Sequence, residues 1–489
     1  MKRFSFEKSQ KEDRLSNLKK NGDFVSYENL GHHTPYRISY LYSIVDTNIL
    51  HRDLLQNLED PFDSLEELKK KLPFEEIIIT NDVDELEERI LKGYVALSLV
   101  GKDDGYILLS CIDLQGRDII PPMTEYSVEG PKEAFVESMK TNINLVRKRL
   151  PVVDLKIELM EVGAKSRTGV ALLYMENEVN MEDVNLVRTK IEAITIDNIA
   201  DSAYIQQIIQ DNWRSPFPQL KNTERPERLC NSLCEGKVCI LVDGSSFALS
   251  GPSSIFDFFN SSGDYYLTWQ VASVFRIMRY FALLFSLLAT PLYVATLTFH
   301  YELIPRDLLG TLVGSRVDIP FPPILEALFL EITIELLREA GARMPSKIAQ
   351  TIGIVGGIVL GTASVEAGLT SNVLIIIVAL TTISSYTSPV YRMGNAFRVV
   401  RFVFLIFASY LGLIGIAICG AFLLTHLLRL TSLGHPYMTP IYPPRSEMWR
   451  DMLIRLPFRY LRRQNVSSLS MEQSFKDIFK KKQKTDIDE

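Results

Sequence analysis

The fold class of this chain is decided by residues 319–370, which read IPFPPILEALFLEITIELLREAGARMPSKIAQTIGIVGGIVLGTASVEAGLT. An acidic apolar segment is followed at once by a glycine-striped apolar one. The part from Ile348 to Val365 carries no charge, and its length is close to the roughly 17 residues that a helix needs to cross hydrocarbon. This stretch therefore predicts a membrane-crossing helix.

Glycine recurs at every fourth position of this helix, at Gly353, Gly357 and Gly361. On a helix these positions share one face, where a neighbouring backbone can approach closely, so a helix-packing face is expected. The opposite face is polar at both ends and apolar in the middle, and it carries Thr351, Val355, Ile358, Thr362 and Glu366. Such a row is suited to line a pore with a constriction near Ile358, but an ordinary buried helix of a membrane bundle has the same pattern.

Acidic residues at membrane depth are the second candidate feature. Glu326, Glu331 and Glu335 make residues 322–337 costly as a lipid-facing span, so this segment is expected to be interfacial, re-entrant or buried against protein. Pairing with the nearby Arg338 is the plain structural explanation. Glu366 has two interpretations, an ion site at a pore mouth or a solvated residue just beyond a helix end.

The remaining composition divides the chain in two. Of the 489 residues, 47% are hydrophobic, but the first half is rich in charged residues and the second is mostly apolar. The net charge of -6 gives no electrostatic signature for nucleic acid, so none is expected as a partner. Residues 1–24 lack a continuous apolar core, which argues against a secretory signal peptide and favours a cytoplasmic N-terminal half. The five cysteines are expected to be reduced.

The pattern predicts an α+β N-terminal region of two similar α/β subdomains, followed by an all-α multi-span membrane domain. The expected divisions are a flexible polar leader (1–34), subdomain 1 (35–128), subdomain 2 (129–244), an interfacial connector (245–274), a membrane domain of about four to five segments (275–430) and a basic tail (431–489).

Local patterns give the expected elements of the N-terminal half. Apolar spacing predicts helices over Tyr40–Leu54, over 65–72 and, beginning near Pro131, over 131–150. Strands are expected over 76–80, 94–100, 106–111, 155–160 and 169–174. The order of helix, glycine and strand around Gly93 returns around Gly236, which indicates two related units or a coincidence. Residues 245–264 are expected on the bilayer surface, and 212–226 as a connector.

Candidate spans are residues 281–299, 348–365, 373–387 and 402–424. Arginines before the last of them, including Arg398 and Arg401, favour the cytoplasm, and so do the basic residues that follow it. Both flanks cannot be cytoplasmic if the last span crosses once. An N-terminus and a tail on the cytoplasmic side, with an even number of crossings, are expected.

No catalytic or nucleotide-binding constellation is present, so neither an enzyme nor a cofactor is expected. Cys230, Cys234 and Cys239 have spacing that does not converge three thiols, and no fourth ligand lies nearby. No metal site is expected.

Several separated motifs together resemble the A subunits of the GerA family of spore germinant receptors. They are EGPKEAFVESMKTNINLVRKRL (129–150), SPFPQLKNTERP (215–226), IPFPPILEALFLEITIELLREAG (319–341), QTIGIVGGIVLG with SVEAG (350–368) and YRMGNAFRVVRF (391–402). The resemblance spans residues 35–440. It implies a cytoplasmic domain of two similar subdomains, and copies of the chain arranged around an ion-conducting pore, expected as a pentamer. It also implies a transporter-like B subunit that binds the nutrient, a C-subunit lipoprotein, and the inner membrane of the spore.

Three functions remain open: a subunit of a nutrient-gated ion channel, a monomeric transporter using Glu331 or Glu335 for protons, and a scaffold without its own pore. An amplifying relative that answers no nutrient is a further alternative. No inverted repeat of spans is visible, which disfavours the transporter.

Overall fold

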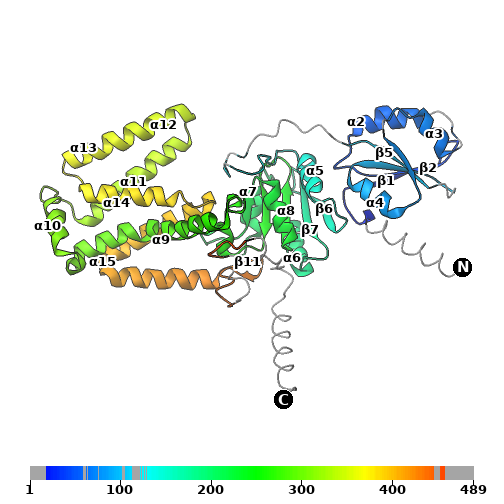
Figure 1. The fold of residues 1–489 in the computed structure, drawn as a ribbon. Coiled ribbons are helices and arrows are strands. Elements are labelled where there is room, and N and C mark those ends of the chain that lie inside the picture. The colour runs from blue at the N-terminus through cyan, green and yellow to red at the C-terminus, as the bar shows by residue number, and fades with distance from the viewer. Residues whose placement is uncertain are drawn as a thin grey trace, which may run out of the picture.

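The computed structural model contains two α/β units and a helical region (Figure 1). It describes residues 18–58, 62, 64–74, 76–101, 105–112, 122, 124, 125, 127, 129–444 and 452–457.

The first α/β unit is built on a five-stranded antiparallel sheet with the order β1-β2-β4-β5-β3. Its strands are β1 (Phe24–Asn29), β2 (Tyr36–Leu41), β3 (Ile77–Thr80), β4 (Tyr94–Leu99) and β5 (Tyr106–Ser110). One face is covered by α2 (Thr47–Ile49), η1 (Leu50–Leu55), η2 (Gln56–Leu58) and α3 (Leu65–Lys71), and the other by α4 (Val83–Leu91).

The helix expected over Tyr40–Leu54 is wrong in its first part. Residues 36–41 form β2, because Tyr36 and Ile38 alternate toward the core with a period of two. Helical structure begins only at Thr47, where the Asp46 side chain accepts a hydrogen bond from the Asn48 amide.

The second α/β unit has a sheet of the same kind, in the order β6-β7-β9-β10-β8. Its strands are β6 (Leu155–Val162), β7 (Thr168–Met175), β8 (Lys221–Thr223), β9 (Val238–Val242) and β10 (Ala248–Gly251). One face is covered by α6 (Met181–Glu192) and α7 (Ser202–Ile209), and the other by α5 (Met139–Arg149) and α8 (Pro226–Cys234). Helix α5 begins eight residues after Pro131 and is capped by Ser138, so proline does not start it.

The two sheets have the same strand order when their strands are numbered from one to five. Gly93 precedes β4 and Gly236 precedes β9, which are equivalent strands. Both glycines have a positive φ, 95° and 76°, which is a backbone conformation that other residues rarely adopt. The sequence similarity around them therefore falls at equivalent positions of two units with one topology.

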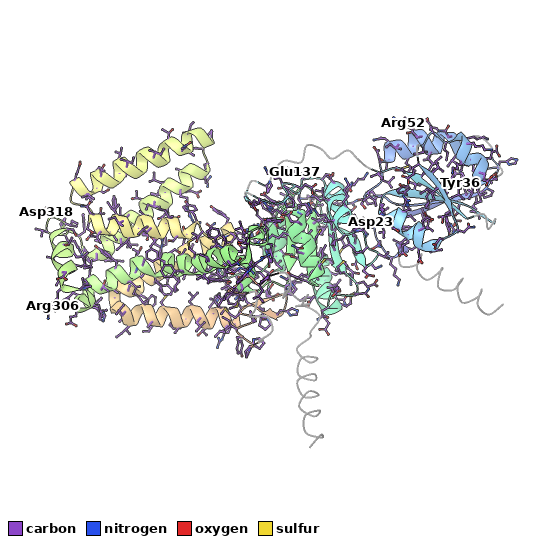
Figure 2. All side chains as sticks on the ribbon, viewed as in Figure 1. Asp23, Tyr36, Arg52, Glu137, Arg306 and Asp318 are labelled. Atoms are coloured by element: carbon purple, nitrogen blue, oxygen red, sulfur yellow. The ribbon has the colours of Figure 1, made fainter. Side chains whose placement is uncertain are left out.

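The expected flexible leader is wrong for residues 18–34. Strand β1 pairs with β2 along its whole length. Asp23 lies where the two units meet (Figure 2) and is fully buried. Its carboxylate forms an ion pair of 3.0 Å with Arg147, which is also fully buried. The described part of the leader thus belongs to the first sheet and joins it to the second unit.

The helical region begins with α9 and ends with α15. Its elements are α9 (Trp269–Phe299), η5 (Tyr301–Leu303), α10 (Arg306–Gly314), α11 (Pro323–Ala342), α12 (Ser346–Val355), η6 (Gly356–Leu360), α13 (Gly361–Glu366), α14 (Asn372–Ser385) and α15 (Tyr391–Arg429). Among the described residues, three helices are long and apolar enough to cross a membrane, namely Trp269–Phe299, Ile348–Glu366 and Tyr391–Arg429. We call the end of this region beside the second unit the proximal end, and the end that carries Arg306 and Asp318 the distal end (Figure 2).

The single membrane crossing predicted over residues 402–424 is wrong, because α15 is a hairpin. Gly412 has φ 62° and ψ -138°, which breaks the helix. A Cβ at Gly415 would lie 2.2 Å from the carbonyl oxygen of Phe407, whereas eight residues of straight helix span about 12 Å. The arm 413–429 therefore runs back beside 391–411 toward the α/β units (Figure 1). Both basic flanks consequently lie at the proximal end, which removes the conflict between them.

The segment 245–264, expected on the bilayer surface, lies between the second α/β unit and the proximal end of the helical region. Residues 248–251 form β10, and the following η3 (Ile255–Phe258) and η4 (Ser262–Tyr265) are short 3-10 turns. Phe258 and Phe259 are buried against Phe217 and Tyr437, in a cluster that joins the second unit to the proximal end of α9 and α15.

Candidate functional site

The predicted pore row lies on α12, η6 and α13, which we call the wall helix (348–366). It is 6% buried, and Figure 1 shows it along the outer edge of the helical region. Ile358 is 63% exposed, and Thr351, Thr362 and Glu366 are exposed as well. The side chain of Val355 lies outside the described part. A single chain thus presents this row without enclosing it.

The wall helix is not a regular α-helix, although the predicted row assumed one. Residues 356–360 form a π-helical turn between α12 and α13. A π turn contains an extra residue, so it rotates everything after it about the helix axis. Thr362 and Glu366 are therefore turned relative to Thr351, and the row is less straight than uniform spacing predicts.

The expected glycine packing face has no neighbour within the described chain. A Cβ placed on Gly353, Gly357 or Gly361 would meet nothing within 4 Å. Instead, Gly356 makes the close contact, because a Cβ there would lie 2.8 Å from the Cδ2 of Leu337 on α11. The sequence periodicity located the small residues but could not show which of them faces α11. The π turn changes the direction in which the residues of this helix point.

Glu331 lies in the interior of the helical region, with 1% of its surface exposed. One carboxylate oxygen lies 2.5 Å from Nη2 of Arg401 on α15, and the other accepts a hydrogen bond of 2.9 Å from the Thr290 hydroxyl on α9. Arg401 is also buried, so the pair is shielded from water and ties three helices together. Glu331 is therefore buried against protein, which is one of the three alternatives predicted for residues 322–337.

Glu335 lies one turn farther along α11 and faces Arg401 and Arg398 of α15. It is paired with Arg338 on its own helix, and its Oε1 atom lies 3.9 Å from Nη2 of Arg401 and 4.0 Å from Nε of Arg398. Nε and Nη1 of Arg401 have no hydrogen-bond partner among the described residues. The cluster therefore holds more guanidinium donors than its two carboxylates satisfy.

Glu326 belongs to a separate group at the distal end. Its carboxylate is paired with Arg316 at 2.7 Å and accepts a hydrogen bond from the Ser371 amide at the start of α14. The Ser371 hydroxyl in turn lies 3.0 Å from the hydroxyl of Tyr293 on α9. This group fixes the distal ends of α9, α11 and α14, and it is not connected to the Glu331 cluster.

The motif at 215–226, expected as a plain connector, attaches the helical region to the second α/β unit. The Phe217 ring packs edge-on against Phe397 of α15 with centroids 5.6 Å apart. The Ser215 hydroxyl lies 2.9 Å from Nε2 of His426 in the returning arm. The prolines predicted a stretch without regular structure, but its residues 221–223 form β8. Nothing in the sequence identified the partner helix.

The strands β11 (Thr431–Ser432) and β12 (His435–Pro436) follow α15 and also contact the second α/β unit. The hydroxyl of Thr431 and the amide of Gly434 donate to Asp211, and Nε2 of His435 lies 2.9 Å from Asp183. The start of the expected basic tail is therefore docked on the second unit, and residues 458–489 lie outside the described part.

A family model described as the Bacillus/Clostridium GerA spore germination protein matches residues 14–466. The chain belongs to this family. It is 46% identical over 462 residues to the spore germination protein GerQA of Bacillus cereus, covering 94% of this chain and 93% of that one. It is 48% identical over 456 residues to GerIA of the same species, covering 93% of this chain and 68% of that one.

Among solved structures, the N-terminal domain of the A subunit of the Bacillus megaterium spore germinant receptor GerK3 is similar to this chain. It is 27% identical and matches with a TM-score of 0.36, covering 49% of this chain and 91% of that one. The family membership makes this chain a spore germination protein of the germinant receptor A-subunit type. The apolar helices are those of a membrane protein.

Proposed function

We propose that this chain is the A subunit of a nutrient-responsive spore germination receptor, and that its copies form a ring, expected as a pentamer, around a gated ion channel. The wall helix lines the pore, and Ile358 forms the apolar constriction. The chain carries out no enzymatic reaction. It works with a transporter-like B subunit, which binds the nutrient, and with a C-subunit lipoprotein, in the inner membrane of the spore.

The observation that carries this proposal is the exposure of the wall helix. The wall helix carries no charge from Ile348 to Val365 and is 6% buried within its own chain, so it needs other surroundings, either lipid or further copies of the chain. Its exposed face includes the carboxylate of Glu366, which is costly against lipid and favourable in a water-filled passage. Neighbouring copies in a ring would supply partners for Gly353, Gly357 and Gly361.

The positions of the basic flanks support a cytoplasmic location of the α/β units. Arg276 at the start of α9, Arg398 in the first arm of α15 and Arg455 after the second arm all lie at the proximal end. Because cytoplasmic flanks carry the excess of Lys and Arg, this arrangement favours both α/β units inside. A proton-carrying transporter is less well supported, since Glu331 and Glu335 are both paired with arginine.

The proposal predicts that Ile358→Ala opens the constriction, because a smaller side chain widens an apolar ring and lets water enter it. In spores carrying this variant as the sole copy, we expect ion release and germination without nutrient to rise at least about tenfold. Flame photometry of the medium and loss of refractility measure the two effects.

The matched control is Leu360→Ala, which removes a similar volume from a residue of the same turn that faces away from Ile358. Normal dormancy and ion retention in Ile358→Ala spores with a normal amount of protein would count against the pore assignment. An equal effect of the two substitutions would show general loosening of the helix instead of a specific constriction.

A further inference from the structure

We propose that Arg401 and Glu331 are positioning residues that hold the channel closed, and that opening transfers Arg401 from Glu331 to Glu335. This inference rests on the proposed function, because it concerns how the α/β units control the wall helix. Neither residue lies on the wall helix itself, and each acts through the helix that carries it.

The present pairing favours Glu331. The Arg401 Nη2 atom lies 2.5 Å from Glu331 and 3.9 Å from Glu335, and Thr290 holds the second Glu331 oxygen. Glu331 and Glu335 are four residues apart on α11, which is about one helical turn, or 5.4 Å. A displacement of α11 along α15 by up to one turn would therefore exchange one carboxylate for the other, as one-turn shifts do at other helix contacts.

In the exchanged arrangement Glu331 keeps only the hydrogen bond from Thr290, so that arrangement costs more free energy and the present one is favoured without nutrient. Arg401 has two nitrogen atoms, Nε and Nη1, without a hydrogen-bond partner in the described chain, and they are available to a second carboxylate. Glu335 is currently shared with Arg338, so it keeps a partner in both arrangements. Because water is excluded from this site, an intermediate position without a carboxylate is costly, which separates the two arrangements.

The side of the pair that carries Arg401 is connected to the second α/β unit. Phe397 precedes Arg401 by one turn of the same helix and packs on Phe217 of the loop at 215–226. Val390, just before the start of α15, is buried in the same cluster as Phe217. A movement of this loop therefore shifts the first arm of α15, and Arg401 with it.

The side that carries Glu331 is connected to the wall helix. Leu337 follows Glu331 on α11 and contacts Gly356 in the π-helical turn, which ends two residues after Ile358. The end of α11 at Ala342 is joined to α12 by only three residues, 343–345. A shift of α11 is thus passed directly to the turn that carries Ile358.

Two isosteric substitutions on one helix distinguish this inference from a merely structural ion pair, since they act in opposite directions. Glu331→Gln removes the closed-state partner and leaves Glu335, so nutrient-free germination is expected to rise at least about tenfold. Glu335→Gln removes the open-state partner, so the nutrient concentration for half-maximal germination is expected to rise at least about tenfold. Glu339→Gln is the matched control, because Glu339 forms an exposed pair with Arg343 on the same helix.

The substitutions are compared in spores that carry the full chain with its partner subunits, with protein amounts measured by immunoblot. Should Glu331→Gln fail to accumulate, Thr290→Val removes only the hydroxyl that holds Glu331, and it is expected to change dormancy in the same direction but less strongly. The exchange would be overturned if Glu331→Gln and Glu335→Gln changed germination in the same direction. It would also be overturned if a Thr290→Val protein accumulated normally and left dormancy unchanged.

Currents through the purified complex in planar bilayers separate this inference from the proposed function. If the wild-type complex and the Ile358→Ala variant conduct while Glu331→Gln leaves the open probability unchanged, the exchange is wrong and the channel stands. If no variant conducts but Glu331→Gln and Glu335→Gln still act oppositely in spores, the channel is wrong and the coupling between α15 and α11 stands.

Discussion

Two neighbouring lysines show at the scale of single residues how the second α/β unit tolerates buried charge. Lys221 in β8 and Lys237 before β9 are 9% and 4% exposed. Burial, together with the positive charge of Arg228, lowers the pKa of Lys221 to about 7. Burial alone would also lower the pKa of Lys237, but the carboxylates of Asp257 and Glu235, each 3.0 Å away, outweigh it and raise that pKa.

The first prediction concerns the pH dependence that Lys221 produces. Its pKa is about 7 in the folded chain and about 10.4 when unfolded, so between these values the unfolded chain binds the proton more readily and stability rises with pH. We therefore expect Lys221→Met to raise the melting temperature of the purified full-length protein by several degrees at pH 6 and by less at pH 9, measured by tryptophan fluorescence. Lys237→Met is the contrasting control, because it leaves the half-buried carboxylate of Asp257 without its lysine partner and should lower the melting temperature at both pH values. A gain for Lys221→Met that grows with pH would contradict this account.

The hairpin of α15 is the feature that most determines the arrangement of elements. It places the returning arm against the second α/β unit, where Ser215 contacts His426. The sequence could not reveal it, because Gly412 lies in a continuous apolar run that is equally consistent with one straight span. The conflict between the basic flanks was the available signal, since two cytoplasmic flanks require the chain to turn back.

Substitution of Gly412 tests this hairpin. Its φ of 62° is unfavourable for other residues, and an added Cβ would lie 2.7 Å from Cε1 of His300. We expect Gly412→Ala to destabilise the protein by about 1–3 kcal/mol, seen as a lower melting temperature and a lower amount in spore membranes. Gly420→Ala, in the returning arm with nothing within 4 Å of the added Cβ, is the control and should change neither. Equal behaviour of the two variants would argue against a turn at Gly412.

Other elements were predictable to different degrees, for physical reasons. The repeat of helix, glycine and strand was visible because a positive φ at Gly93 and Gly236 restricts the residue type. Strand β2 was mistaken for a helix because a short apolar run fits both periods. The packing of Phe258 and Phe259 on Phe217 and Tyr437 could not be predicted, because these partners lie far away in the sequence. The acidic residues of α11 were found by composition, whereas the pairing of Glu331 with Arg401 depends on the tertiary fold.

At the scale of the whole molecule, the proposed function makes this chain one subunit of a larger assembly. Its α/β units, the attachment loop at 215–226 and the buried charge cluster form a connected path that ends at the wall helix. That helix is the least buried of the three candidate spans found among the described residues. We therefore expect the purified protein to be a closed oligomer in detergent, with the wall helix shielded by neighbouring copies.

Current through the purified complex carrying Ile358→Cys tests the central claim most directly, with a positively charged, water-soluble methanethiosulfonate reagent added to the bilayer chamber. The account predicts that the complex conducts and that the reagent reduces the current by more than about 80%, because a bulky charged group then fills the apolar constriction. Leu360→Cys, on the other side of the same turn, is expected to be far less sensitive. A complex that passes no current, or one whose current is unaffected although mass spectrometry shows Ile358→Cys to be fully modified, would contradict the account.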